Sequence, residues 1–162
     1  MSDRKAKLKA KLDTARSYLL AVAAQVTDDR ALAATENPEW NVHDILAHLA
    51  VAERGLQATV QRFLAGDPLP EGFSLDVWNR RQVAKHKDRP VAELLESLRA
   101  SRQDTLALLD SLSEEQLDVS GTHPAGFQTT VAGIFRVMAI HERDHGREIA
   151  AALGLAVEPP SV

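Results

Sequence analysis

Four long segments of the chain place apolar residues three or four positions apart, the spacing that aligns side chains along one face of an α-helix. No segment shows the sustained alternation of apolar and polar residues that is typical of a strand. Amphipathic helices bury their apolar stripes most simply against one another. The sequence therefore predicts an all-α four-helix bundle, with apolar stripes over residues 8–26, 42–63, 91–112 and about 129–153.

Capping and turn residues indicate where these helices begin and end. Asn41 is a favoured N-cap, and Asp44, three residues later, completes a pair that resembles a capping box. Pro90 suits the first turn of a helix, because its missing N–H would have no partner there. Gly66 and Gly154 are expected to stop the second and fourth helices, since glycine readily adopts the left-handed conformation that ends a helix.

The connection between the second and third helices, about residues 67–89, is long for a helical bundle. Its middle, residues 75–85, is predicted to form a short extra helix, and residues 113–117 are predicted to form a further helical turn. A connection of this length permits a crossover instead of a simple up-and-down path. We expect one domain over residues 1–162, in which about 155–162 is a flexible tail.

Composition narrows the classes of function. The chain has no cysteine, which excludes disulfides, CxxC metal sites and a catalytic thiol. Its net charge is −4 and both signs are interspersed, so no nucleic-acid partner is expected. No apolar run approaches the length of a membrane span, and the start of the chain lacks the apolar core of a signal peptide. These features favour a cytoplasmic protein with no membrane partner.

The stretch His141-Glu142-Arg143-Asp144-His145 has the clearest relation to chemistry. Histidines four residues apart project from the same face of a helix, separated by about 6 Å of rise. Both lie at the centre of the apolar stripe of the last helix and are therefore expected to point into the bundle. Two buried imidazoles need partners for all of their nitrogen atoms, and one shared metal ion would serve both.

A third metal ligand is expected on the second helix. His48 lies at the edge of the apolar stripe there, and it reaches the same ion if the second and fourth long helices face each other. Three imidazoles around an open position are typical of catalytic zinc or nickel sites. Glu148, three residues after His145, is a candidate to orient an imidazole, although a position at the rim explains it equally well. The histidines expected to lie outside the site are His43, His86 and His123.

Five stretches of the chain carry a family resemblance: Trp40–Leu49, Asp76-Val77-Trp78-Asn79, Arg89-Pro90, Leu98-Arg99-Ala100-Ser101-Arg102 and His141–His145. They resemble the DinB/YfiT-like superfamily, in particular ClbS/DfsB-type proteins and the N-terminal domain of mycothiol-dependent maleylpyruvate isomerases. The resemblance covers essentially the whole chain. Its most specific parts are the tryptophan-led start of the second helix and the histidine pair of the last helix.

The resemblance implies a four-helix bundle with a crossover that often forms dimers, so a homodimer is expected. The three metal-binding positions of the family correspond to His48, His141 and His145 in this sequence. A polar position that recurs near the pocket of the family corresponds to Asn79. The family includes thiol transferases, isomerases and resistance proteins, so the resemblance indicates a metal site more specifically than a reaction.

Two other kinds of metalloenzyme fit less well. The H-E-x-x-H pattern is also that of zinc proteases, in which Glu142 would be the general base. However, the extension H-x-x-G-x-x-H is absent, and no predicted strand could hold an extended peptide, so a classical HExxH protease is not expected. A di-iron bundle needs a second E-x-x-H on another helix, and the sequence has none.

The leading hypothesis is a divalent-metal-dependent transferase that uses an external low-molecular-weight thiol, similar to mycothiol or bacillithiol, on a small electrophile. Coordination to a metal favours the thiolate, which is the nucleophile. One alternative is a metal-dependent hydrolase of the ClbS-like resistance or detoxification kind, in which a metal-bound water attacks and Glu142 moves its proton. The other is a bundle that binds a small molecule without catalysis. Basic residues that could hold an anionic thiol or substrate, or simply face solvent, are Arg80, Arg81 and Arg89.

Overall fold

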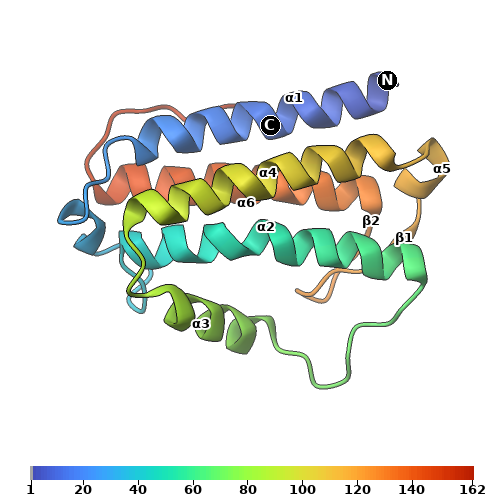
Figure 1. Cartoon of the computed structure of the whole chain (residues 1–162), viewed down its shortest axis with the longest axis horizontal. Coiled ribbons are helices and arrows are strands. Elements are labelled where there is room, and N and C mark those ends of the chain that lie inside the picture. Colours follow the sequence, from blue (N-terminus) through green and yellow to red (C-terminus); the bar gives the residue numbers. More distant parts are fainter. Residues whose placement is uncertain (1) are drawn as a thin grey trace.

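Four long helices form the body of the molecule, of which the computed structural model describes residues 2–162 (Figure 1). They coincide with the four segments of helical spacing and confirm the predicted all-α four-helix bundle. Each buries the apolar stripe that its sequence carries. The four helices are α1 (Asp3–Ala23), α2 (Val42–Ala65), α4 (Val91–Ser111) and α6 (Val131–Ala152).

Shorter elements occupy the connections. The predicted extra helix and helical turn are both confirmed, as α3 and α5. An antiparallel hairpin of two three-residue strands, β1 and β2, was not predicted, because strands this short show no alternation that could be recognised. The elements are η1 (Arg30–Leu32), α3 (Leu75–His86), α5 (Glu114–Leu117), β1 (Ser120–Thr122) and β2 (Gln128–Thr130).

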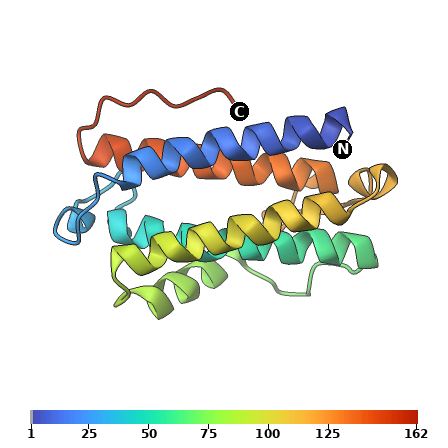
Figure 2. The same cartoon turned by 45° about the horizontal axis from the view of Figure 1, so that its top comes forward.

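The path of the chain is that of a crossover bundle. Figures 1 and 2 show that α2 and α4 run in the same direction, while α1 and α6 both run in the opposite direction. The connection that carries α3 must therefore return along the outside of α2 before α4 begins. The closest packing is between α1 and α6 and between α2 and α4, and α2 also packs against α6. This last contact brings the predicted third histidine toward the histidine pair.

Local capping agrees with the sequence. The Asn41 side chain accepts a hydrogen bond from the Asp44 N–H at 2.9 Å, and the Asp44 carboxylate accepts one from the Asn41 N–H at 3.1 Å. Pro90 is the N-cap of α4, one position before the first helical residue. Gly66 ends α2 with a φ of 71°, a left-handed conformation that glycine adopts without steric cost. The start of α2 is therefore fixed firmly near His48.

The core of the bundle consists of two apolar clusters with a charged layer between them. One cluster lies around Leu19 and Ile45, and the other around Leu12 and Phe135. The buried charged side chains between them come one from each long helix: Arg16, Glu53, Arg102 and Glu142. Charged residues are rarely buried unless they are paired, and all four of these are paired with one another.

After α6 the chain turns back beside α1 as an extended segment (Figure 2). Leu155 and Val162 pack against the two core clusters, and the Val157 carbonyl accepts a hydrogen bond from the Tyr18 hydroxyl at 3.3 Å. The flexibility expected of about residues 155–162 stays a prediction. Within the described residues, none of the helices combines the length and apolar character that crossing a membrane requires.

Candidate metal centre and adjoining cavity

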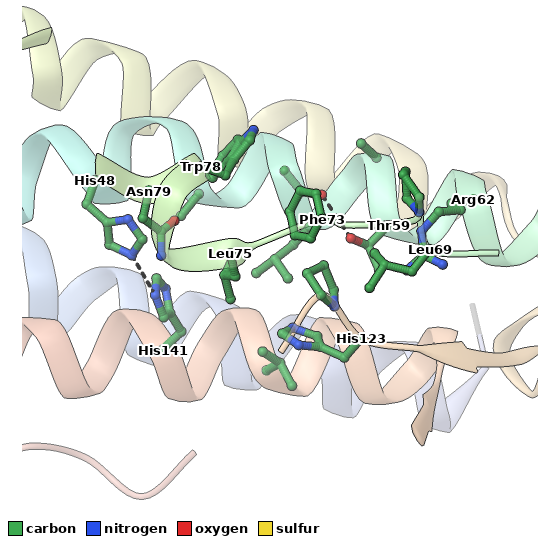
Figure 3. A pocket seen from close by; sticks show the side chains of 17 residues that line it. His48, Thr59, Arg62, Leu69, Phe73, Leu75, Trp78, Asn79, His123 and His141 are labelled. Carbon is green, nitrogen blue, oxygen red and sulfur yellow. Dashed lines mark hydrogen bonds between the residues drawn. The ribbon is translucent and has the colours of Figure 1, made fainter. Parts of the chain in front are cut away.

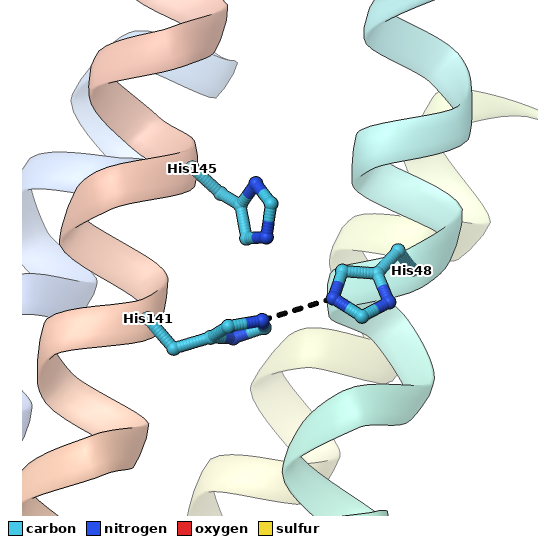
Figure 4. Close-up of side chains that lie close together, drawn as sticks. All are labelled: His48, His141 and His145. Carbon is cyan, nitrogen blue, oxygen red and sulfur yellow. Dashed lines mark hydrogen bonds between the residues drawn. The ribbon is translucent and has the colours of Figure 1, made fainter. Parts of the chain in front are cut away.

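Three histidine side chains from two facing helices converge on one point (Figure 4). His48 projects from α2, while His141 and His145 project from successive turns of α6. One ring nitrogen from each lies within 4.8 Å of the other two, and the Nε2 atoms of His48 and His141 are 2.9 Å apart. The geometry thus brings together the three residues expected from the sequence to hold a metal.

The protonation states of these rings suit metal binding. Burial, followed by the nearby His145, lowers the pKa of His48 to about 3. Burial, with His145 and His48 beside it, also places the pKa of His141 well below its usual value. Both rings are therefore neutral at pH 7, and a neutral imidazole is the form that binds a metal. Three imidazole nitrogen donors fit a divalent ion of intermediate softness such as zinc or nickel.

Glu148 lies beside the third histidine of the triad. Its Oε2 atom is 3.0 Å from Nδ1 of His145, one helical turn away. Because a carboxylate only accepts hydrogen bonds, this contact holds the His145 proton on Nδ1 and leaves Nε2 free as a donor atom to a metal. The arrangement is the one expected of a residue that orients a ligating imidazole.

Glu142 follows His141 in sequence, but its carboxylate takes part in the buried charged layer. One oxygen accepts from Nε of Arg16 and the other from Nη2 of Arg102. Glu142 is only 4% exposed, so solvent does not provide further partners. Each oxygen already accepts from a buried arginine, so the carboxylate belongs to the charged layer, and its role in proton transfer stays a prediction.

A cavity of about 300 Å³ adjoins the triad (Figure 3). His48 and His141 form part of its wall, and Asn79 of α3 lies beside them. Most of the remaining wall is apolar and comes from α2, α3, the segment before α3, and α6. The apolar lining residues include Leu56, Leu69, Phe73, Leu75, Trp78 and Val137.

Two polar residues of this wall were not expected from the sequence. Arg62 on α2 and His123 in the hairpin turn both line the cavity. His123 follows a strand too short to recognise, so the sequence placed it in a polar connection, whereas only 6% of it is exposed. Arg62 belongs to the last turn of α2, where a basic residue is common for reasons of helix stability alone. Only the folding of the hairpin onto α2 brings the two together.

The other basic and histidine residues lie elsewhere. Of the arginines expected near the second connection, Arg80 pairs with Glu39 at 3.6 Å and Arg89 pairs with Glu93 at 3.5 Å. Neither these two arginines nor Arg81 belongs to the wall of the cavity. The histidines outside the cluster of possible ligands include His43, whose Nε2 is 2.7 Å from the Arg89 carbonyl oxygen, and His86.

Comparison with known families identifies the fold. The sequence pattern of the DinB superfamily matches residues 11–149, which include all four long helices in whole or in large part. The chain belongs to the DinB superfamily. The resemblance inferred from the tryptophan-led helix and the histidine pair is thereby confirmed, and the triad lies within the matched part of this DinB protein. Among curated proteins, none matches the chain.

Solved structures share the DinB fold at low sequence identity. YfiT from Bacillus subtilis, described as a probable metal-dependent hydrolase with an unusual four-helix bundle topology, superposes with a TM-score of 0.77 at 18% identity, over 96% of this chain and 91% of YfiT. A mycothiol-dependent maleylpyruvate isomerase superposes with a TM-score of 0.76 at 15% identity, over 94% of this chain. The protein described as sibling lethal factor precursor, DfsB, gives 0.71 at 17% identity, over 93% of this chain and 95% of DfsB.

The extent of these matches differs between the relatives. The matched region makes up 64% of the isomerase, slightly less than two thirds of its length, whereas it makes up nearly all of YfiT and DfsB. Identities of this size establish a shared fold and leave the reaction open, because one fold carries many activities. The activity of this DinB protein must therefore be argued from its own site.

Proposed function

We propose that this protein is a divalent-metal-dependent enzyme that acts on a small molecule bound in the cavity beside His48, His141 and His145. One observation carries the proposal: two of the three converging imidazoles form part of the wall of an otherwise mainly apolar cavity. Structural zinc sites are closed by four protein ligands, whereas three ligands leave a position for a substrate or nucleophile. The cavity is at the lower end of the volumes that small-molecule sites have.

The reaction that we favour is the transfer of an external thiol to a small electrophile. A bound divalent metal would supply a lowered pKa for a thiol or a water molecule that occupies its open position. The thiol has to come from outside, since the chain has no cysteine. The apolar wall around Phe73 and Trp78 would hold the electrophile and keep water away from it.

Hydrolysis is the second candidate, and a specific observation favours it. YfiT, described as a probable metal-dependent hydrolase, superposes over 96% of this chain and 91% of its own length. The same three histidines and the same cavity would serve both reactions. The two differ only in whether a thiol or water provides the attacking atom.

In either reaction the residues of the chain have distinct tasks. His48, His141 and His145 would hold the metal, and Glu148 would keep the His145 ring in its orientation. Asn79 would contact the substrate close to the metal, because its side-chain oxygen is buried there without a partner. A homodimer, expected from the family resemblance, is part of the proposal and is checked by light scattering of the purified protein.

Metal analysis of the purified protein tests the site. We expect about one transition-metal ion per chain, and loss of that ion in His48→Ala, His141→Ala and His145→Ala. His86→Ala, which removes a histidine outside the cluster, should keep the ion. Unchanged metal content in all three triad variants would overturn the proposal.

Activity assays then separate the reactions. Thiol transfer predicts consumption of monochlorobimane only when mycothiol or bacillithiol is present, whereas hydrolysis predicts turnover of activated esters without a thiol. Both activities should disappear in His141→Ala. If the metal-loaded protein catalyses neither reaction but still binds small molecules in the cavity, it is a binding protein and the proposed catalysis is wrong.

A further inference from the structure

The unsatisfied polar atoms of the molecule are concentrated in the cavity. Three buried side-chain atoms in the described residues lack a hydrogen-bond partner: His48 Nδ1, Asn79 Oδ1 and His123 Nε2. All three belong to residues that line this one cavity. Buried polar atoms in folded proteins nearly always have partners, so a cluster of exceptions needs an explanation. A ligand in the cavity would provide the missing partners.

His123 presents a hydrogen-bond donor to this cavity. Its Nδ1 accepts a hydrogen bond from the Ala125 N–H at 3.0 Å, and its ring stacks on Phe127 with centroids 4.4 Å apart. Burial and the neighbouring Arg62 lower the pKa of His123, which keeps the ring neutral. A neutral imidazole that accepts at Nδ1 carries its proton at Nε2. The unpartnered Nε2–H therefore requires an acceptor atom on the ligand.

Arg62 adds a positive charge close to His123. Its guanidinium donates to the carbonyl oxygens of Asp67 at 3.3 Å and of Thr122 at 2.5 Å, and Thr122 directly precedes His123. Among the described residues, none of the ion pairs includes Arg62. Its contacts are with neutral carbonyl groups and with the Phe63 ring, 5.1 Å from the guanidinium carbon, so no anionic group among the described residues balances its charge. Guanidinium groups bind carboxylates well.

The two ends of the cavity differ in chemistry. Figure 3 shows His48 and His141 at one end and Arg62 at the opposite end, with apolar side chains such as Leu75 and Phe73 between them. A molecule that spans this cavity therefore needs an apolar body. The part of it that lies between His123 and Arg62 needs an anionic acceptor that can meet a neutral N–H and a cation together.

We propose that the substrate is a small organic carboxylate with an apolar body, and that Arg62 and His123 bind its carboxylate away from the triad. This inference rests on the proposed function in one respect: the reacting atom of the substrate lies near the metal. Arg62 and His123 determine which substrates bind and in which direction they enter. They take no part in the bond-making step, which the triad end of the cavity supports.

Binding of three molecules with one carbon skeleton tests the proposal. The probes are 4-phenylbutanoate, 4-phenylbutanamide and 4-phenylbutylamine, and their affinities for the purified full chain are measured by isothermal titration calorimetry. We expect the acid to bind about ten-fold or more tightly than the amide, because hydrogen bonds to a charged acceptor are stronger. The amine should bind most weakly, since its charge repels Arg62. Equal affinities for acid and amide would overturn the proposal.

Two variants assign this preference to residues. His123→Phe keeps an aromatic ring against Phe127 but removes the donor, and Arg62→Gln removes the charge. Each should weaken binding of the acid about ten-fold while changing binding of the amide less. The matched controls His86→Phe and Arg80→Gln alter residues outside the cavity and should leave both affinities unchanged. An acid affinity that neither cavity variant changes would also overturn the proposal.

The same measurements on protein treated with EDTA separate this inference from the proposed metal site. Acid binding that survives metal removal and still depends on Arg62 supports the inference. Acid binding that is lost with the metal and is insensitive to Arg62→Gln makes the carboxylate a metal ligand and overturns it, leaving the metal site intact. Conversely, selective acid binding in a protein that contains no metal as purified and takes up none when zinc or nickel is added overturns the metal site alone.

A measurement on the unaltered protein tests the same contact without any substitution, in case the variants fail to fold. The Nε2–H proton of His123 is observed by NMR in protein labelled with ¹⁵N in histidine. We expect the acid to shift this signal and to slow its exchange with water, because the proton becomes engaged in a hydrogen bond. A signal that is unchanged at saturating acid would show that the carboxylate lies elsewhere.

Discussion

The Glu142 carboxylate on α6 accepts a hydrogen bond from the Arg102 guanidinium on α4. Glu142 directly follows His141 of the triad in the sequence. Arg16 bridges Glu142 and Glu53, and Arg102 bridges the same two carboxylates. The four side chains form a closed ring with one member from each long helix. This ring fixes the height of α6 relative to α2, and with it the position of His141 opposite His48.

The ring of four charged side chains predicts that replacing Glu142 by glutamine, a residue of similar size, strongly lowers the stability of the fold. Glu142→Gln leaves two buried arginines with one carboxylate, so we expect the free energy of unfolding to fall by about 3–5 kcal/mol. Urea denaturation followed by circular dichroism measures this. Asp144→Asn, which affects a partly exposed pair with Arg143, should cost less than about 1 kcal/mol. Normal stability with complete loss of activity in Glu142→Gln would instead favour a proton-transfer role.

The contact between Glu148 and His145 predicts an effect on metal affinity. Glu148→Gln removes the carboxylate that lies 3.0 Å from Nδ1 and makes the imidazole a weaker donor. We expect the affinity for zinc to fall about 10- to 100-fold, with the helical content retained. Competition with a zinc chelator measures this change. Glu71→Gln, at an exposed position, provides the matched control, and equal affinities of the two variants would refute an orienting role.

The lowered pKa of His48 predicts how stability depends on pH in metal-free protein. The unfolded chain takes up a proton at His48 near pH 6.5, whereas the folded chain does so only near pH 3. Between these values the unfolded state binds more protons, so the free energy of unfolding falls as the pH falls. From pH 7.5 to 5.5 this histidine should account for about 1.4 kcal/mol of lost stability.

This pH dependence can be tested with one variant. Urea denaturation of EDTA-treated protein is measured at pH 7.5 and 5.5 for the natural sequence and for His48→Gln. The variant should lose less stability between the two pH values, because its side chain does not titrate. An identical loss in both proteins would mean that His48 already carries a proton, or is exposed, in the folded state.

The packing of the hairpin predicts a site that tolerates no added atom. A Cβ at Gly121 would lie 2.6 Å from the nearest ring carbon of Phe63, a buried residue of α2. Gly121→Ala should therefore displace the hairpin and lower the free energy of unfolding by about 1–3 kcal/mol. Ser120→Ala, at an exposed position of the same strand, should change stability by less than about 0.5 kcal/mol. Equal stability of the two variants would show that the hairpin adjusts freely.

Helices and their limits could be predicted because the information is local. The Asn41 cap, the stop at Gly66 and the apolar stripes depend on residues a few positions apart, and the structure confirms them. The hairpin around Gly121 could not be predicted, since each strand has only three residues and pairs with a partner across a turn. Three residues are too few for an alternating pattern to be distinguished from chance.

The candidate site also divides into a part that local sequence spacing predicts and a part that depends on helix packing. His141 and His145 could be placed on one face from their spacing alone, and His48 could be added only on the condition that two helices face each other. The sequence also placed Glu142 beside this pair as a candidate for proton transfer, but its carboxylate lies in the ring with Arg16 and Arg102. The direction of a side chain depends on which partners the other helices bring within reach.

By itself, the sequence determined that this protein is a helical bundle, that its last helix carries a histidine pair, and that any thiol must come from outside. The tertiary structure alone decided that His48 meets this pair, that four charges close a ring in the core, and that Arg62 and His123 line the same cavity. The physical reason is the distance along the chain over which the interacting residues are spread. Helical spacing is set by neighbours along the chain, whereas the site is assembled from residues more than ninety positions apart, which only helix packing brings together.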